Sequence, residues 1–343
     1  AMPVYSTAGT RGAGRRPPIY RGRLRLLAII SLVVLIATVF LLTVNFTLAQ
    51  PATAAPDRPV PTHGPFIDDL LAGPLPASIA STYDAFRPRS YGLATAPAVS
   101  AGAYILVDLD SGETLASLDP HARVAVASLT KIVTAMTALR LASAGDQLIV
   151  GVEAALAPPN RMGILPGEVL TVEDLLYGLL LDSGNDAAAT LAANLGGEEA
   201  FVQAMNTLAA EIGLINSRFT NPAGFDDAGS HSTAYDMAVL ARRLLDTEPL
   251  LARIVGTERQ IIESSPAHGW FGPTNLNRLL TDYPGALGVK TGRTDSAGYT
   301  LIAAAERDGR RLLVVVLGSE HHFDDAEILL DFGFAMAGPG PVG

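Results

Sequence analysis

The two lysines of this chain are its first candidates for chemistry. Of 24 basic residues, 22 are arginine, and lysine occurs only at Lys131 and Lys290. Arginine stays protonated in proteins, whereas a buried lysine shifts its pKa readily. A position that keeps lysine in so arginine-rich a chain is therefore expected to need an amine that can lose its proton, or a compact positive charge.

Ser128 precedes Lys131 by three residues, and an apolar, alanine-rich run follows from Ile132 to Leu139. The run predicts a buried helix, and residues three apart share one face of a helix. The hydroxyl and the amine are therefore expected to meet near the helix N-terminus, whose partial positive charge favours a developing oxyanion. The pair is typical of a serine nucleophile activated by a lysine base, although an isolated S-x-x-K is more often a capping serine and a first-turn lysine.

Two further triplets combine with this pair. S-G-N at 183–185 lies in a polar loop, 182–186, between apolar helical runs, and K-T-G at 290–292 lies in a segment expected to be a strand, 288–294. Alone, each triplet is more often a turn or a strand end than a site. Together they give the order S-x-x-K, S-x-N, K-T-G, in which the only two lysines fill both lysine positions. We therefore interpret the three motifs as parts of one site.

The elements that must position these motifs are expected to form a sheet from both ends of the domain. Strands at 104–108 and 114–118 flank a D-S-G turn, and strands at 299–305 and 311–317 flank Asp308-Gly309, so each pair predicts a hairpin. Between them, helices are predicted at 171–181, 198–213 and 233–246, with a closing helix at 324–334. The expected fold class is α/β, more narrowly α+β, with a helical lobe inserted in the middle.

The N-terminal region indicates export. Residues 1–25 hold six arginines and no acid, and residues 26–48 include a stretch of 19 residues without a charge. This stretch is long enough to span a bilayer, and the basic residues before it place the N-terminus in the cytoplasm. The pattern predicts a basic cytoplasmic tail and a transmembrane anchor at the extracytoplasmic face of a cell membrane. A cleaved signal segment, which would give a secreted protein, is the alternative.

Residues 49–100 hold 9 of the 23 prolines and predict a Pro/Ala-rich spacer, with short helices at 66–71 and 79–86 that dock on the domain. The folded domain is expected at 101–337, followed by a tail at 338–343.

The composition of the chain excludes several classes of partner and chemistry. The net charge of −10 argues against binding of nucleic acid and against adhesion to an anionic membrane surface. No cysteine is present, so thiol chemistry is excluded. No metal or other cofactor is expected, because the adjacent His321 and His322 point in two directions.

The three motifs resemble those of penicillin-binding proteins and serine β-lactamases. The residues around them, at 127–135, 183–188, 231–237 and 288–295, strongly resemble the low-molecular-mass D-alanyl-D-alanine carboxypeptidases. The resemblance covers about residues 101–337. It implies a β-lactamase/transpeptidase-like fold, in which an antiparallel sheet is flanked by helices and a helical lobe, with the site in the cleft between them.

The resemblance implies roles for the motif residues in an acyl-enzyme reaction on peptidoglycan stem peptides. Ser128 attacks the carbonyl of the penultimate D-Ala, and Lys131, kept neutral by burial and by repulsion from Lys290, is the base. Ser183 relays the proton to the leaving amine. The backbone N–H groups of Ser128 and Arg293 form the oxyanion hole. Water completes the cycle, and β-lactams are expected to acylate the same serine and leave slowly.

The remaining motif residues are expected to bind substrate. Asn185 holds the amide backbone, Lys290 supplies a fixed positive charge, and Thr291 offers a hydroxyl to the free C-terminal carboxylate. Gly292 lets the substrate backbone lie against the strand. Relatives often place an arginine after the last strand, where this chain has E-H-H-F at 320–323. Part of the carboxylate recognition is therefore in question; Arg293 is one replacement, and an exposed strand arginine without a role is the other interpretation.

Three alternatives to a carboxypeptidase stay open on the sequence. A D,D-endopeptidase has the same motifs. A β-lactamase has the same fold, although no E-x-x-x-N run follows Ser183 at a suitable distance. An inactive wall-binding homologue would not need the complete set of motif side chains that this chain retains. The sequence also ends soon after the closing helix, so the β-rich C-terminal domain and the C-terminal anchor of many relatives are not expected.

Overall fold

The computed structural model describes residues 85–88 and 95–337, all within a unit that spans His63–Gly343. The expected basic tail, the anchor or signal segment, the helix at 66–71, most of the helix at 79–86 and the tail at 338–343 lie outside the described residues. Ala85 and Phe86, which end the second expected spacer helix, form a bend instead. In the described ranges, no helix combines the length and the apolar character needed to cross a membrane.

The predicted sheet from both ends of the domain is confirmed. Six strands lie in the order β1-β3-β2-β8-β7-β6, with bounds β1 Arg87–Pro88, β2 Ala103–Asp108, β3 Glu113–Leu118, β6 Ala286–Thr294, β7 Gly298–Arg307 and β8 Arg310–Ser319. The two hairpins join where β2 pairs antiparallel with β8, with Tyr104 opposite Val316. The sheet is antiparallel except at one edge, where the two residues of β1 run parallel to β3.

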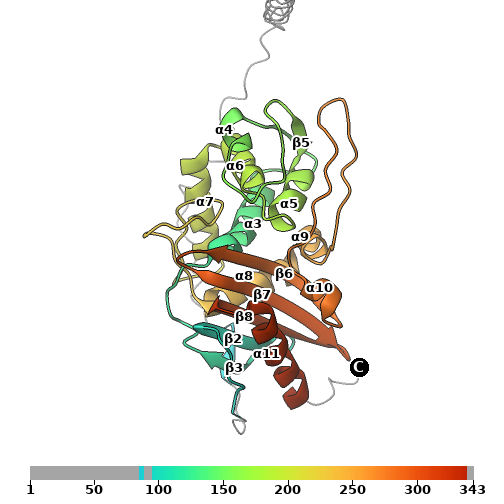
Figure 1. The fold of residues 1–343 in the computed structure, drawn as a ribbon. Helices are drawn as coiled ribbons and strands as arrows, with labels where there is room; N and C mark the ends of the chain where they lie inside the picture. The colour runs from blue at the N-terminus through green and yellow to red at the C-terminus, as the bar shows by residue number, and fades with distance from the viewer. Residues whose placement is uncertain (1–84, 89–94, 338–343) are drawn as a thin grey trace, which may run out of the picture. The chain divides into compact units, whose positions relative to one another are not determined.

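Both faces of this sheet are covered, which explains why its strands are continuous apolar runs rather than alternating ones. Successive side chains of a strand point to opposite faces. Ile105 and Val107 of β2 therefore join the core beneath α8 (Ala234–Thr247), whereas Tyr104 and Leu106 join a second core beneath α11 (His322–Ala337). The three layers are visible in Figure 1, with α11 on one face of the sheet and α8 on the other.

The middle of the chain forms the predicted helical lobe around α3 (Lys131–Leu141), whose residues from Lys131 to Ala138 are all buried. Helices α5, α6, α7 and α8 pack against α3, and the lobe lies beyond one end of the sheet (Figure 1). A capping box between Thr171 and Asp174 begins α5. The remaining elements are β4 Gln147–Ile149, α4 Val152–Ala155, β5 Val169–Thr171, α5 Val172–Leu180, α6 Asn185–Asn194, α7 Glu198–Glu211, α9 Pro249–Val255 and α10 Leu279–Asp282.

Two local differences from the expected elements bear on the motifs. Ser128 lies in a 3₁₀ turn, Ala127–Thr130, that precedes α3 rather than in the helix itself. The polar loop that carries S-G-N is shorter than expected, because α6 already begins at Asn185. Thus Asn185 projects from the first turn of a helix, where its position is more strongly fixed than in a loop.

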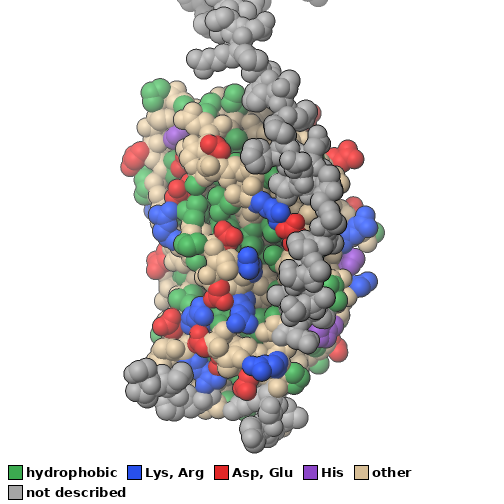
Figure 2. All heavy atoms as spheres, turned by 180° about the vertical axis from the view of Figure 1, so that it is seen from behind, with side chains coloured by type: hydrophobic (Ala, Val, Ile, Leu, Met, Phe, Trp, Pro, Cys, Tyr) green, Lys and Arg blue, Asp and Glu red, His purple; other side chains and the backbone are tan. Residues whose placement is uncertain are grey.

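Charged side chains of both signs are mixed on one face of the described domain. Figure 2 shows one face of the molecule, on which basic and acidic side chains lie interspersed rather than in a patch of one sign. A contiguous basic footprint would be needed to neutralise a run of phosphates. This face therefore lacks the electrostatic pattern of a nucleic-acid site.

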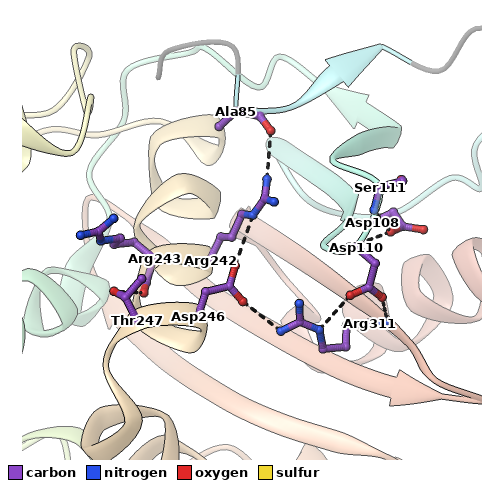
Figure 3. Close-up of polar contacts among 9 residues, drawn as sticks. All are labelled: Ala85, Asp108, Asp110, Ser111, Arg242, Arg243, Asp246, Thr247 and Arg311. Carbon is purple, nitrogen blue, oxygen red and sulfur yellow. Dashed lines mark hydrogen bonds and ion pairs between the residues drawn. The ribbon is translucent and has the colours of Figure 1, made fainter. Parts of the chain in front are cut away.

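A chain of polar contacts ties the short segment that contains β1 to the rest of the domain (Figure 3). Arg242 on α8 donates to the carbonyl oxygen of Ala85 at 3.1 Å and pairs with Asp246 at 3.5 Å. Asp246 in turn pairs with Arg311 of β8 at 2.9 Å, and Arg311 reaches Asp110 in the β2–β3 turn at 3.0 Å. The segment is thereby connected to a helix, a strand and a turn.

Candidate active site

The predicted meeting of Ser128 and Lys131 is present. In a 3₁₀ turn, residues three apart eclipse one another, and the turn that carries Ser128 leads directly into the first residue of α3. Lys131 Nζ lies 3.0 Å from Ser128 Oγ. The lysine is completely buried, whereas the serine is partly exposed and lines a cavity.

Two further oxygen atoms fix the position of the amine. Lys131 Nζ lies 2.8 Å from Asn185 Oδ1 and 2.6 Å from the carbonyl oxygen of Ala223. The orientation of the Asn185 amide follows from its other contact, since Nδ2 donates to the carbonyl oxygen of Pro158 at 2.9 Å. A carbonyl can only accept, so the amide oxygen must face the lysine.

These contacts determine how a neutral Lys131 would be arranged. A neutral amine has two N–H groups and one lone pair. Asn185 Oδ1 and the Ala223 carbonyl can only accept hydrogen bonds, so they take both N–H groups. The lone pair then faces the hydroxyl of Ser128, from which it can accept the proton. The site is therefore built so that deprotonation of Lys131 orients a base toward the serine.

The pKa of Lys131 is lowered well below its ordinary value. Burial is the main cause, and repulsion from Lys290 adds to it, while the carboxylate of Asp186 acts in the opposite direction. These are the two causes that the sequence predicted for a neutral lysine. Burial also lowers the pKa of Lys290, to about 7. The positive charge that the resemblance implies for Lys290 therefore depends on pH near neutrality.

The predicted site residues meet at a cavity of about 450 Å³. Its lining includes Ser128, Ser183, Asn185, Thr291, Gly292 and Arg293, whereas Lys131 and Lys290 are buried behind that lining. A larger hollow of about 670 Å³ is lined by residues of α3, α7 and α8 and by Ala85. Its charged residues include the Arg140–Glu211 and Arg242–Asp246 ion pairs, and neither lysine lies in it. The chemistry therefore belongs to the smaller cavity.

Ser183 is held at the cavity by an unusual backbone conformation. Its φ of 59° lies in the left-handed region, which a non-glycine residue occupies only where the surroundings impose it. On its C-terminal side, Gly184 N donates to the carbonyl of Gly178 at 2.9 Å and Asn185 N donates to the carbonyl of Asn160 at 2.8 Å. These bonds fix the turn that presents Ser183 next to the first turn of α6.

At two glycines the backbone lies close against the turn that carries Ser128. A Cβ on Gly292 would lie 3.0 Å from the backbone nitrogen of Ser128. A Cβ on Gly224, whose φ is +83°, would lie 2.1 Å from the carbonyl oxygen of Ala127. Gly292 was expected to make room for substrate, and the structure shows that it also makes room for the serine itself.

Several residues that shape the site were not predicted. The carboxylate of Asp186 accepts from the backbone N–H of Met162 at 2.9 Å and of Gly163 at 2.8 Å. Asn221 Oδ1 accepts from the N–H groups of Gly224 at 2.8 Å and Phe225 at 3.0 Å, so it shapes the loop that carries the Ala223 carbonyl. The sequence N-P-A-G at 221–224 has the turn chemistry that could have indicated this loop.

The two histidines after the last strand lie in different surroundings. His322 is partly buried and lines the cavity, together with Tyr299 and Phe323, whereas His321 is exposed and is not part of the lining. The Arg293 guanidinium carbon lies 5.1 Å from the centre of the Tyr299 ring. Arg293, which the sequence left between a binding role and no role, therefore lies at the cavity beside an aromatic ring.

Ser128 lies within hydrogen-bonding distance of a buried lysine, and the S-x-N and K-T-G motifs lie at the same cavity. This arrangement defines the penicillin-binding class of active-site serine proteins. Comparison of the chain with known proteins identifies the family within this class. A sequence model of the D-alanyl-D-alanine carboxypeptidase family matches residues 92–321. The chain belongs to this family, as the three motifs predicted.

Similar proteins support the assignment along the whole domain. The D-alanyl-D-alanine carboxypeptidase DacB2 of Mycobacterium tuberculosis is 37% identical over 71% of this chain and 85% of its own length. DacF of Bacillus subtilis is 36% identical over 69% of this chain, which spans only 63% of that relative.

Solved structures show the fold. A D-alanyl-D-alanine carboxypeptidase of M. tuberculosis superimposes with a TM-score of 0.68 at 36% identity, covering 74% of this chain and 97% of that one. A Streptomyces DD-transpeptidase superimposes with a TM-score of 0.66 at 29% identity, covering 71% of this chain and 100% of that one. The chain therefore has the expected transpeptidase-like fold.

Proposed function

We propose that this protein is a serine D-Ala-D-Ala carboxypeptidase that removes the terminal D-Ala from peptidoglycan stem peptides through an acyl-enzyme on Ser128. The single observation that carries the proposal is the position of Lys131. Its amine lies 3.0 Å from the Ser128 hydroxyl while two acceptor-only oxygens take its hydrogens. Family membership supplies the substrate class, and the geometry supplies the nucleophile and its base.

Acylation begins when neutral Lys131 accepts the hydroxyl proton of Ser128. Ser128 Oγ then forms a bond with the carbonyl carbon of the penultimate D-Ala, and the negative charge on the carbonyl oxygen is stabilised by the backbone N–H groups of Ser128 and Arg293. The peptide C–N bond breaks as the leaving amine receives a proton, relayed from Lys131 through Ser183. D-Ala departs, and the peptide remains as an ester on Ser128.

Deacylation repeats the same steps with water. The base accepts a proton from water, the hydroxide oxygen attacks the ester carbonyl, and Ser128 leaves with that proton. Asn185 holds the substrate amide, and Thr291 with Lys290 faces its carboxylate. An anionic substrate stabilises the protonated form of Lys290, so binding would raise the pKa that burial lowers. A β-lactam would acylate Ser128 without supplying a leaving group that diffuses away.

The proposed place of action is the extracytoplasmic face of the bacterial cell membrane, reached through the segment 26–48 as an anchor, or after cleavage as a secreted protein. The support is the 19-residue uncharged stretch behind six arginines. Residues 49–100 would then act as the spacer that lets the domain reach the cell wall.

The test uses the full chain beside Ser128→Ala. Both are incubated with a fluorescent penicillin and, separately, with a peptide ending in D-Ala-D-Ala. Labelling with slow turnover and release of D-Ala, both lost in the variant, would support the carboxypeptidase. Rapid penicillin hydrolysis without peptide cleavage would indicate a β-lactamase, and neither labelling nor release would leave a wall-binding role.

A second candidate is acyl transfer to an amine, as in the similar Streptomyces protein named a DD-transpeptidase. In this reaction an amino group replaces water in the second step. Adding a D-amino acid to the peptide assay distinguishes the two, since a transferase would form the exchanged peptide at the expense of the shortened one. Release of the shortened peptide from a cross-linked dimer would instead indicate the D,D-endopeptidase.

A further inference from the structure

Arg293 is the one permanently charged side chain among the described lining residues of the catalytic cavity. The two lysines behind the lining are buried, and both have lowered pKa values. In the described part of the chain, nine ion pairs involve other arginines, and none involves Arg293. An arginine that faces a cavity without a carboxylate partner keeps its charge available for an anionic ligand group.

The Arg293 guanidinium is held by an aromatic stack instead of an acid. Its central carbon lies 5.1 Å from the Tyr299 ring centre. Tyr299 stacks on His322, with ring centres 4.8 Å apart and planes within 5° of parallel. Phe323 follows at 4.1 Å from His322, and Arg278 lies 4.6 Å above Phe323. The stack therefore begins at Arg293, which lines the cavity, and ends at a second cation, Arg278.

The far end of the stack is fixed by ordinary polar contacts. Arg278 is bonded to Asp324 at 2.9 Å. The turn before His322 is held by Ser319, whose Oγ accepts from His321 N at 2.9 Å and donates to the carboxylate of the buried Asp325 at 2.7 Å. His322 is thereby held in place from the side opposite to Arg293.

A neutral imidazole suits this position. Burial and the nearby Arg278 lower the pKa of His322, while Asp324 and Asp325 act in the opposite direction. The ring is then uncharged at neutral pH, so it extends the aromatic surface without placing a second positive charge near Arg293. A carboxylate partner would also have held Arg293, but it would have competed with an anionic substrate for the guanidinium.

We propose that the stack of Arg293, Tyr299 and His322 is the specificity element for the free carboxylate of the substrate, in which Arg293 binds the carboxylate and Tyr299 and His322 are positioning residues that hold the guanidinium at the cavity. The inference rests on the proposed function for the identity of the substrate. It also assigns to His322 an indirect role in binding the carboxylate.

The experiment compares a peptide ending in D-Ala-D-Ala with the same peptide carrying a C-terminal amide. Affinities are measured by NMR titration of the full chain with Ser128→Ala, so that no turnover is needed, and KM and kcat are measured with the intact serine. His322→Ala and Tyr299→Leu are the test variants. His321→Ala, one residue away and outside the cavity, is the matched control, and Tyr299→Phe keeps the ring.

Removing a ring of the stack is expected to weaken binding of the free acid by about 3- to 10-fold, which is about 0.7–1.4 kcal/mol and lies within the range of a cation–π contact. The affinity for the amide and the value of kcat stay nearly unchanged, as do both affinities in His321→Ala and Tyr299→Phe. Arg293→Gln is expected to remove the preference for the acid altogether.

Three results would overturn the inference. His322→Ala could behave like His321→Ala, Arg293→Gln could keep the preference for the acid, or the test variants could lose affinity for acid and amide equally, as a purely structural defect would. Failure of the proposed function has a different signature. It would be an intact serine that neither reacts with penicillin nor cleaves the peptide, while the Ser128→Ala titrations still report the preference for acid or amide.

Discussion

The amine of Lys131 lies 2.6 Å from the carbonyl oxygen of Ala223, a residue 92 positions further along the chain. This carbonyl belongs to none of the three motifs, yet it takes one of the two hydrogens that a neutral lysine has to offer. Without it, one N–H of Lys131 would be free to turn toward Ser128, and the lone pair would turn away. The loop that follows Asn221 therefore helps to orient the amine of Lys131, the proposed base.

Asn221 is expected to control the orientation of the Lys131 amine through the Ala223 carbonyl. Asn221→Ala removes the acceptor of the N–H groups of Gly224 and Phe225, so the Ala223 carbonyl loses its fixed position. We expect the rate of acylation by a fluorescent penicillin to fall about 10-fold, which is part of the roughly 100-fold or larger contribution of a general base. Asn221→Asp keeps an oxygen acceptor and should retain most of the rate. Equal losses in both variants would show that the loop acts in another way.

Replacing Lys131 tests the base directly. Lys131→Arg keeps a positive charge and donors but cannot deprotonate. Acylation is expected to fall by about 100-fold or more, the usual contribution of a general base. Stopped-flow labelling with penicillin gives the rate, and circular dichroism confirms that the variant is folded. A folded Arg variant that retains near-normal acylation would rule out deprotonation of residue 131 as a requirement.

A side chain at a glycine with positive φ can destabilise the protein in two ways, through backbone strain and through a clash of its Cβ. Substitutions at Gly224 and Gly167 distinguish these two effects. The two have φ values of +83° and +86°, but a Cβ meets the Ala127 carbonyl oxygen only at Gly224 and has open space at Gly167. Gly167→Ala is expected to lower the free energy of unfolding by about 1–2 kcal/mol, the cost of the backbone conformation. Gly224→Ala should lower it further and also abolish acylation. Urea unfolding and penicillin labelling measure the two effects, and similar losses in both variants would contradict the predicted clash.

The buried Lys290 predicts a pH dependence of stability. Its pKa in the folded protein is about 7, against an ordinary value of 10.5. Between these values the unfolded chain binds more protons than the folded one, so the free energy of unfolding rises with pH across the window. Lys290→Met lacks this group. Its stability relative to the wild type should therefore be greatest below pH 7 and should decline toward pH 10.5.

Thermal unfolding at a series of pH values measures this difference, with the two proteins in the same buffers. A difference in melting temperature that stays constant from pH 7 to pH 10 would show that Lys290 is charged in the folded protein throughout.

The motif residues could be identified from the sequence because their types, spacing and order along the chain are characteristic of the site. Ser128 and Lys131 are three residues apart, and that spacing brings them together in a 3₁₀ turn as well as in a helix. The Ala223 carbonyl could not be identified in this way, since any residue supplies a carbonyl and the fold alone selects which one faces the amine. The lowered pKa of Lys290 could not be predicted for the same reason, because the sequence does not show that its amine is buried.

The contacts within the aromatic stack could not be predicted from the sequence either, although the sequence shows the residues that form it. Tyr299 and His322 come from β7 and from the start of α11, and only the packing of the turn after β8 brings their rings into parallel contact. The E-H-H-F segment showed that an expected arginine was missing, but not which of the two histidines faces the cavity. The short elements α4, α9 and α10 were not predicted, because four to seven residues carry too little periodicity.

The pairing of β2 with β8 determines when the site can assemble during synthesis of the chain. Ser128 follows the first hairpin, whereas the strand that carries Lys290 comes more than 150 residues later, and the sheet closes only when the last hairpin arrives. A chain still emerging from the ribosome would thus possess its serine but not the pocket around it. If the protein reacts with penicillin as proposed, that reactivity would begin only when synthesis of the domain is almost complete.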